Sequence, residues 1–500
     1  MTALHDGSPL KILVTGASGY IGGRLVPLLI EAGYSVRVLV RDPDRLRDIP
    51  WASDVEVFKG DLLDPAALSA AFKDVDAAYY LVHSMGPGAS RKTFSGTEQE
   101  CATNFVAAAE SAGVARFVYL SGLHPDGPLS PHLRSRTTVG NVLLESTVPA
   151  VVLQAGVVIG SGSASFEMIR HLTDVLPWMP APKWVRNRVQ PIAVRDVLYY
   201  LVHVLDIDAR TNRTFDIGGP DVLSYADAMN GYAAEAGLPK RLILALPVLT
   251  PRLAAHWVNV VTPIPHSLAG PLVESLQHSC VVRERDLDAL IPEPGGGRTG
   301  YRQAVRLALG KMRDGQVVTS WQNASVAGAP SDPLPSDPDW AGHSVYTDLR
   351  SRESDASVDQ LWRVIEGIGG ERGWYSFPLA WALRGWMDKF VGGVGLRRGR
   401  RDPNTLFVGE ALDFWRVEGL DRGRLLRLRA EMKVPGRAWL ELSAEPSDDG
   451  QGCRYQQRAI FFPRGLFGRL YWFSILPFHG IIFSGMANRI IQAAGAKNGE

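Results

Sequence analysis

The chain has 500 residues, of which 46% are hydrophobic and 21% are charged, as in globular proteins with two to four domains. The formal net charge of +1 excludes a global positive field that would recruit nucleic acid. The three cysteines, Cys101, Cys280 and Cys453, lie far apart in sequence, which argues against a disulfide framework and a zinc site. The N-terminus has no signal-peptide pattern, so we expect a cytoplasmic protein.

The segment KILVTGASGYIGGRL, residues 11–25, runs from an apolar strand pattern through a glycine-rich turn into helical periodicity. This order is the context in which a glycine motif predicts dinucleotide binding rather than a purely structural turn. The three glycines would allow a tight turn, close approach of a pyrophosphate and close packing of the helix. We therefore predict that the cofactor contacts Thr15, Gly16, Ser18, Gly19, Tyr20, Ile21 and Gly22.

Strand and helix patterns alternate after this turn. Apolar strand patterns are found at residues 35–40, 55–58, 76–81 and 116–120, and residues 94–112 have the periodicity of an amphipathic helix. This alternation predicts an α/β Rossmann fold with a doubly wound parallel sheet. Ligands of such sheets bind beyond the carboxyl ends of the strands, so the residues that follow each strand are candidate site residues.

The residues after the second and third strands suggest where the adenosine half of the cofactor binds. An acidic residue after the second strand would favour NAD, but this chain has Arg41 there, with Arg37 and Arg45 nearby. These cations favour the 2′-phosphate of NADP(H) over NAD(H), and a solvated turn is the alternative. After the third strand, Asp61 and Leu62 would bracket the adenine, unless Asp61 is a helix cap.

The residues after the fourth and fifth strands would run beside the rest of the cofactor. After the fourth strand we predict contacts from Leu81, Val82, His83 and Ser84. After the fifth strand, Ser121 lies where a nicotinamide would react, and His124 follows three residues later.

The TGASGYIG motif, the Gly60-Asp61-Leu62 turn and the strand ending in Ser121 resemble the extended and atypical, NmrA-like branches of the short-chain dehydrogenase/reductase superfamily. The resemblance covers residues 10–310 and implies an NAD(P)-binding Rossmann core with a substrate-binding C-lobe at about 155–310. Residues 151–160 and 190–197 resemble later strands of extended members, with Asp196 near a helix start.

One departure from that family concerns the reaction itself. Active members use a serine followed by Tyr-x-x-x-Lys, whereas His132 and Arg136 occupy that register here. Histidine can donate a proton at neutral pH, so His132 or His124 would replace the phenol, with Arg136 in place of the lysine. The alternative is that His132 is a surface residue and the domain binds NADP(H) without turnover, as some NmrA-like sensors do.

Two C-lobe segments are open to two interpretations. Residues 160–168 either bind substrate through a serine or Glu167, or form a flexible loop with a capping box near Ser165. Residues 242–261 are apolar but interrupted by prolines and charges, so we predict buried or substrate-lining segments rather than a membrane span.

A linker at residues 311–343, rich in Pro, Ser, Ala, Gly and Asp, precedes a second domain at 344–495. The predicted elements of the second domain are a strand from 344, a helix at 360–368, strands at 412–417, 425–432, 438–444 and 455–462, and an apolar segment at 466–491. This order resembles the α+β helix-grip fold of START-like (SRPBCC) domains and, more narrowly, an uncharacterised domain fused to atypical reductases in bacteria.

In the helix-grip fold a long helix and a curved sheet enclose an apolar ligand, and tryptophans would either line that cavity or form ordinary core. The six candidates are Trp374, Trp381, Trp386, Trp415, Trp439 and Trp472. The loop 392–401, which ends in four arginines, is either a phosphate or lipid head-group site or a solvated loop. We predict that residues 470–486 form a packed terminal helix, with peripheral membrane contact as the alternative.

The leading hypothesis is an NADP(H)-dependent oxidoreductase that acts on a hydrophobic carbonyl, enone or quinone-like substrate. Ser121 would orient the reacting oxygen, and the second domain would deliver or shield the substrate. The rival hypothesis is a non-catalytic NADP(H)-binding sensor or scaffold whose second domain binds a lipid or a partner. A weaker third hypothesis, from fold analogy, is an assembly subunit of a respiratory complex. The sequence leaves substrate identity, reaction direction and oligomeric state open.

Overall fold

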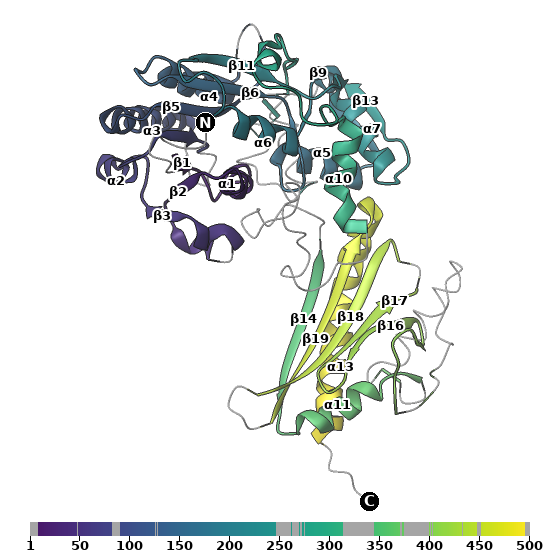
Figure 1. The fold of residues 1–500 in the computed structure, drawn as a ribbon. Coiled ribbons are helices and arrows are strands. Elements are labelled where there is room, and N and C mark those ends of the chain that lie inside the picture. Colours follow the sequence, from purple (N-terminus) through teal and green to yellow (C-terminus); the bar gives the residue numbers. More distant parts are fainter. Residues whose placement is uncertain are drawn as a thin grey trace, which may run out of the picture. The chain divides into compact units, whose positions relative to one another are not determined.

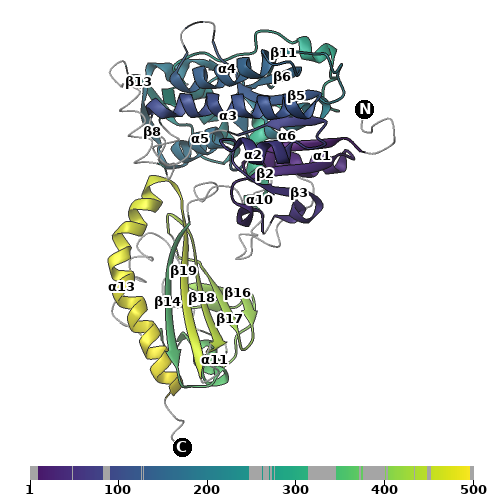
Figure 2. The same cartoon turned by 90° about the vertical axis from the view of Figure 1, so that its left-hand side faces the viewer.

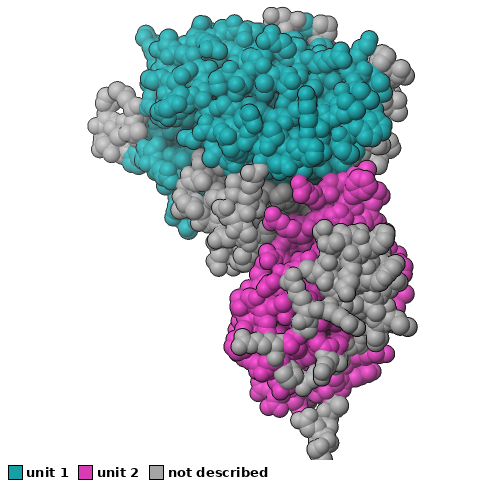
Figure 3. All heavy atoms as spheres, turned by 90° about the vertical axis from the view of Figure 1, so that its right-hand side faces the viewer, with its two compact units in different colours: residues 1–342 teal, residues 343–500 magenta. Residues whose placement is uncertain are grey.

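The computed structural model describes residues 9–47, 49–82, 91–125, 127, 129–246, 262, 270, 273–274, 276–313, 345–370, 373–374, 400, 402, 404–432, 434–447 and 452–495. The chain divides into two compact units, Met1–Gly342 and His343–Glu500 (Figure 3). Each unit has hydrophobic clusters of its own and is described by itself.

The first unit is built on a seven-stranded parallel sheet (Figure 1). Its strands are β1 (Lys11–Thr15), β2 (Ser35–Val40), β3 (Glu56–Lys59), β4 (Ala77–Tyr80), β5 (Arg116–Gly122), β6 (Ala150–Ala155) and β11 (Arg213–Ile217). The order β11-β6-β5-β4-β1-β2-β3 reverses direction beside β1, which creates a topological switch point between β1 and β4.

Helices cover both faces of this sheet, which confirms the prediction of a doubly wound parallel sheet. One face packs against α1 (Gly22–Glu31) and α6 (Val194–His203). The other packs against α2 (Pro65–Ala71), α3 (Arg91–Ala112) and α4 (Pro131–Leu144), and Figure 2 shows α3 and α4 side by side. Strands buried on both faces read as nearly continuous apolar runs, which is why their positions were predictable from the sequence.

A smaller lobe follows the sheet and has its own apolar cluster. Its helices are α5 (Ala164–Val175), α7 (Tyr225–Glu235) and α10 (Tyr301–Arg313). Its strands are β7 (Val158–Ile159), β8 (Trp178–Pro182), β9 (Arg188–Val189), β10 (Ile192–Ala193), β12 (Leu223–Ser224) and β13 (Leu242–Leu246). Short 3₁₀ turns of the first unit are η1 (Pro43–Leu46), η2 (Pro50–Asp54), η3 (Lys183–Arg186) and η4 (Asp286–Ala289).

The prediction of a buried segment from residue 242 is wrong for the outer side of β13. Leu242, Leu244 and Leu246 are exposed, whereas Ile243 and Ala245 pack against the lobe. The reason is that β13 pairs with β8 in a two-stranded sheet, of which one face alone meets the lobe. Residues 247–261 lie outside the described residues.

The second unit is a six-stranded antiparallel sheet in the order β14-β19-β18-β17-β16-β15. Its elements are β14 (Tyr346–Ser354), α11 (Val358–Glu366), β15 (Ala411–Leu412), β16 (Trp415–Asp421), β17 (Leu425–Ala430), β18 (Gly436–Pro446), β19 (Cys453–Pro463) and α13 (Gly465–Gly495). Both helices share one apolar cluster with the sheet. Leu426 and Leu428 are buried in that cluster while Arg427 and Arg429 face away, as the alternation predicts.

Several predictions for the second domain are modified by the structure. Helix α10 extends to Arg313, so the predicted linker at 311–343 starts inside a helix, and residues 314–343 lie outside the described residues. Of the loop 392–401, the structure describes Arg400 alone, whose Nη1 donates to the carbonyl of Ile368 at 2.8 Å.

The predicted tryptophans divide into three groups. Trp374, Trp415 and Trp472 are buried in the unit. Trp439 is partly exposed and donates to the Glu418 carboxylate at 2.6 Å, so it is not part of the buried core. Trp381 and Trp386 lie outside the described residues.

Candidate functional site

The glycine turn after β1 is packed so closely that it has no room for a side chain at Gly16 or Gly22. Gly16 has φ +76°, and a Cβ there would come within 2.7 Å of the Leu81 carbonyl oxygen. A Cβ on Gly22 would come within 2.3 Å of the Gly16 carbonyl oxygen. The close approach draws the residues after β4, Leu81 and Val82, against the turn after β1. Two strand ends therefore meet at the switch point, where ligands of such sheets bind.

The first turn of α1 suits an anionic ligand. Its N-cap residue, Ile21, provides no side-chain cap, and the first turn contains no acidic residue. No side chain caps this N-terminus, although the Gly23 N–H donates to the Gly19 carbonyl at 2.9 Å, and the positive end of the helix dipole favours a phosphate there. The cradle formed by this turn and Gly16, Gly19 and Gly22 therefore fits a dinucleotide pyrophosphate.

Two of the predicted contact residues are held by the protein itself. The hydroxyl of Thr15 donates to the Tyr79 carbonyl at 2.9 Å, so it joins β1 to β4. The centroid of the Tyr20 ring lies 4.1 Å from the Arg24 guanidinium carbon. The Tyr20 hydroxyl packs so closely on Gly160 that a Cβ at that glycine would come within 2.3 Å of it. Tyr20 therefore links the glycine turn to the loop after β7. Ser18 is half-buried in the turn, and His83 and Ser84 lie outside the described residues.

The cations near the end of β2 differ in availability. Arg41 and Arg45 are exposed, directly after β2 and within η1. Arg37 is buried, pairs with Glu56 at 2.7 Å and donates to the Ala71 carbonyl, so the interpretation that it assists a 2′-phosphate is wrong. Its position inside β2 explains this, because its side chain lies in the sheet rather than beyond the carboxyl end.

Asp61 and Leu62 follow β3. Asp61 accepts a hydrogen bond from the Leu63 backbone N–H at 2.9 Å, while α2 is capped by Asp64, so Asp61 is not the helix cap. The side chain of Leu62 is buried in the core under α2 and α3. Burial raises the pKa of the Cys101 thiol to about 11, with Asp61 adding to the shift and Arg41 opposing it. Arg41 and Asp61 therefore lie in the same neighbourhood of the sheet's edge.

The end of β5 brings together Ser121, Arg136 and a tyrosine that the sequence analysis missed. Arg136 Nη2 donates to the Leu120 carbonyl at 2.7 Å. Tyr119 donates to the Arg136 carbonyl at 3.3 Å, and the Ser121 side chain lies near enough to lower the pKa of the Tyr119 phenol. Burial raises the pKa of Tyr119, and the Arg136 charge partly offsets that rise, so the phenol is protonated at neutral pH.

A sequence signal for Tyr119 did exist. Residues two apart on a strand share a face, so a tyrosine two positions before Ser121 was placed to reach it. The family motif has its tyrosine downstream of the serine, so Tyr119, which precedes Ser121, lies outside that pattern.

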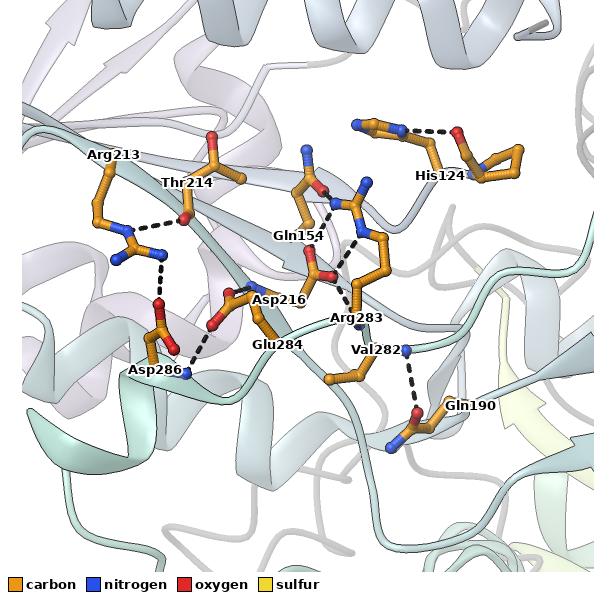
Figure 4. A network of polar contacts seen from close by, with 11 residues as sticks. His124, Gln154, Gln190, Arg213, Thr214, Asp216, Val282, Arg283, Glu284 and Asp286 are labelled. Atoms are coloured by element: carbon orange, nitrogen blue, oxygen red, sulfur yellow. Dashed lines mark hydrogen bonds and ion pairs between the residues drawn. The ribbon is translucent and has the colours of Figure 1, made fainter. Parts of the chain in front are cut away.

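The two candidate histidines lie differently. His132 is half-buried in the first turn of α4, on the same helix face as Arg136. That turn lies beside the end of β5, because a Cβ on Gly122 would touch Leu133 at 4.0 Å. His124 follows β5, and its Nδ1 lies 3.2 Å from the Pro125 carbonyl oxygen (Figure 4).

A polar row that the sequence analysis also missed crosses the ends of three strands. Ser121, Gln154 and Asp216 are in register on β5, β6 and β11, so their side chains lie on one face. Arg283 spans the last two, donating to Gln154 Oε1 at 2.7 Å and to Asp216 Oδ2 at 2.9 Å (Figure 4). The Asp216 side chain is 1% exposed, so its charge depends on this arginine.

The segment that carries Arg283 is fastened at several points along this edge. Val282 donates its backbone N–H to Gln190 Oε1 at 3.0 Å, and Glu284 accepts from the Asp216 N–H at 2.7 Å (Figure 4). Residues from distant parts of the sequence thus meet beyond the ends of β6 and β11, which no local motif could reveal.

The loop after β7 has a buried anchor. Glu167 and Arg170 are fully buried and pair at 3.2 Å, and Glu167 accepts from the Gly162 N–H at 2.9 Å. The N-cap of α5 is Ser163, which makes no side-chain cap bond, so the predicted capping box near Ser165 is wrong. Glu167 therefore fixes the loop that contacts Tyr20, instead of facing a substrate.

Comparisons with known proteins agree with this geometry. A family model described as NAD(P)H-binding matches residues 16–155, which span the glycine turn and the ends of β1 to β6. A second model, described as a protein of unknown function (DUF2867), matches residues 340–486.

Two curated relatives each match just under half of this chain. An NAD(P)H azoreductase of Xenophilus azovorans is 29% identical over 234 residues, which cover 46% of this chain and 76% of that protein. A ceramide reductase of Caulobacter vibrioides is 29% identical over 238 residues, covering 46% and 72%. A triphenylmethane reductase of Citrobacter, solved in complex with NADP(H), has a TM-score of 0.48 at 19% identity, covering 60% of this chain and 100% of that one.

The first unit therefore contains an NAD(P)H-binding domain with a Rossmann-like fold, and the two curated relatives named above are reductases. The prediction of a nicotinamide cofactor is confirmed at this level. The second unit corresponds to a domain without an assigned activity.

We predict that Gly22→Ala weakens NADPH binding at least about tenfold, because its Cβ would force the α1 N-terminus away from the turn. Gly96→Ala is the matched control, because a Cβ at this helical glycine meets nothing within 4 Å. Titration calorimetry with NADPH measures both. Equal affinity in the two variants would show that the cofactor does not use this turn.

We predict that Arg283→Ala lowers the free energy of unfolding by about 2–3 kcal/mol, because it leaves the Asp216 carboxylate buried without its cation. Arg285→Ala, an exposed arginine two residues later, should change it by less than about 0.5 kcal/mol. Urea unfolding measures both, and adding Asp216→Asn to Arg283→Ala should recover part of the loss. If the double variant is no more stable than Arg283→Ala, the charge pair is not the cause.

Proposed function

We propose that the protein is an NADP(H)-dependent oxidoreductase acting on a hydrophobic carbonyl, enone or quinone-like substrate. The observation that supports it best is the cluster of Tyr119, Ser121 and Arg136 at the end of β5. β5 is the neighbour of β4, whose end packs on the glycine turn. A dinucleotide held by that turn and extended across the strand ends would bring its nicotinamide toward Ser121.

In this proposal NAD(P)H supplies the hydride, and the chain's own residues hold the substrate and move the proton. Ser121 hydrogen-bonds the reacting oxygen, and Tyr119 behind it fixes the rotamer of the serine hydroxyl. Arg136 adds positive charge near the oxygen, at the place of the family's lysine. His132, in the first turn of α4 beside Gly122, supplies the proton at neutral pH. His124 is the less favoured donor, because its Nδ1 is directed at the Pro125 carbonyl.

A preference for NADP(H) over NAD(H) is part of the proposal. Arg41 and Arg45 are the exposed cations beside the end of β2, where the ribose 2′ position of a bound dinucleotide lies in this fold. Arg37 is withdrawn into its pair with Glu56, so the preference depends on these two residues.

The second candidate function is an NADP(H)-binding sensor without turnover. It is favoured by the absence of the Tyr-x-x-x-Lys pair and by the commitment of His124 to the neighbouring carbonyl. Tight NADPH binding, combined with no oxidation in the presence of any acceptor, would favour it.

For the second unit we propose a START-like helix-grip domain that binds an apolar molecule. The proposal is supported by the antiparallel sheet, the long α13 packed on one of its faces, and the aromatic stack of Trp374, Phe414 and Trp415 in the interior. Such a domain would present a hydrophobic substrate to the first unit.

We predict that Ser121→Ala lowers kcat/KM at least about a hundredfold with quinone, enone or azo-dye acceptors, while the Kd for NADPH is unchanged. Tyr119→Phe keeps the ring packing and should reduce kcat by about tenfold, since it removes the hydroxyl that lies near Ser121 and donates to the Arg136 carbonyl. Stopped-flow NADPH oxidation measures these values. Wild-type turnover that Ser121→Ala and His132→Ala both leave intact would contradict the catalytic assignment.

We predict that Arg41→Ala raises the Kd for NADPH about tenfold and leaves that for NADH unchanged, because only NADPH has a 2′-phosphate to lose a partner. The control is Arg47→Ala, an exposed arginine of the same loop that pairs with Asp44 at 2.6 Å. Fluorescence titration with both nucleotides measures the ratio. A parallel loss for NADH would show that Arg41 contacts a shared part of the cofactor.

A further inference from the structure

The terminal helix α13 exposes a continuous row of large apolar side chains along its first half. Phe467 is 74% exposed, and Leu470, Phe473, Phe478 and Ile481 are each more than half exposed. Successive members are three to five residues apart, so they lie along one side of the helix. We call these five residues the apolar stripe. It is about 21 Å long, at 1.5 Å per residue.

The opposite side of α13 is fixed in the core of the second unit. Trp472, Phe483, Met486 and Ile490 are buried, and three of them belong to the cluster that joins the sheet to the helices. Figure 2 shows α13 lying along one face of that sheet. The helix has 31 residues, and an 18-residue window of it reaches a mean hydropathy of 1.3, as in a membrane span, but a helix packed on a sheet cannot be surrounded by lipid.

The side of α13 that carries the apolar stripe becomes polar after Ile481. Further along it, Asn488, Arg489 and Gln492 are the exposed residues. The second half is therefore an ordinary amphipathic helix, whereas the first half is apolar on both sides. A helix that needed only to cover its own sheet would be polar outside over its whole length, so the stripe indicates a second apolar contact.

The charge around the stripe indicates the chemistry of that contact. Residues 450–499 contain no Asp or Glu, and their six cations are Arg454, Arg458, Arg464, Arg469, Arg489 and Lys497. Arg454 and Arg458 pair with Glu353 and Glu441. Arg464 and Arg469 lie beside the start of the stripe, at the helix end where the dipole is positive.

An apolar helix side flanked by arginines and aromatic rings is the pattern of a helix that lies in a membrane interface. Its apolar side enters the acyl boundary, while long cationic side chains extend to lipid phosphates. We infer that the apolar stripe of α13 docks the protein, with the helix parallel to the membrane plane, on a bilayer surface that contains anionic phospholipids. The inference is independent of the proposed redox chemistry.

The test is flotation of the full chain with vesicles of phosphatidylcholine, with or without about 30 mol % phosphatidylserine, at about 0.1 M salt. We expect binding to the anionic vesicles, reduced at about 0.5 M salt. Phe467→Gln with Phe473→Gln should lower the bound-to-free ratio at least about tenfold. Leu349→Gln with Val408→Gln, at two similarly exposed apolar sites of the same unit, should leave it unchanged.

Thermal unfolding of the variants verifies folding, and NADPH binding serves as an internal control, because all four positions are exposed in the second unit. Absence of wild-type binding to either vesicle would overturn the inference, as would equal binding by the stripe variant. Sedimentation velocity without lipid measures whether the chain is a monomer or a dimer. A dimer that the stripe variant dissociates, with no vesicle binding, would assign the stripe to a second copy of the chain.

Discussion

The first unit depends on one close backbone contact at the centre of its sheet. Gly16, in the left-handed region, lies against the Leu81 carbonyl, and Gly22 lies against Gly16. Because neither position has space for a Cβ, α1 begins directly above the end of β1, and the end of β4 is drawn to the same point. This packing points a helix N-terminus that no side chain caps at the gap where the strand order reverses. The absence of side chains at Gly16 and Gly22 therefore makes this packing, and with it the binding site, possible.

From that contact, strand register determines what lies further along the edge. Parallel neighbours in register carry their side chains on one face, so Ser121, Gln154 and Asp216 form a row without being near in sequence. Tyr119 lies one step deeper on the face of Ser121, and the Ser121 side chain lowers the pKa of its phenol. The row is polar, yet it adjoins an apolar core, and Arg283 makes the burial of Asp216 tolerable. The polar row around Ser121 is thus held by pairs between residues far apart in sequence, whereas the glycine turn is a local motif.

This difference explains what the sequence could predict. Periodicity placed β2 at its observed bounds and the other central strands within a residue or two, since strands buried on both faces read as apolar runs. It failed for Arg37, where a cation near the right strand end is turned into a pair with Glu56. It failed for the outer side of β13, because exposure there depends on which strand pairs with it. It also missed Arg283, which is over a hundred positions from Ser121 and reaches the site through tertiary contacts.

The two units differ in how completely their apolar surfaces are covered. In the first, α1 and α6 on one side and α2 to α4 on the other cover both faces of the sheet, so apolar strand residues are enclosed. In the second, α11 and α13 cover one face, and α13 is itself apolar on the side that faces away from the sheet. Apolar side chains held in water contribute nothing to folding, since burial is the source of their stabilisation. Polar replacements such as those at Asn488 and Gln492 were available on the same side of the helix. The restriction of the apolar stripe to the cation-flanked half of α13 is therefore best explained by a contact made outside the unit's own core.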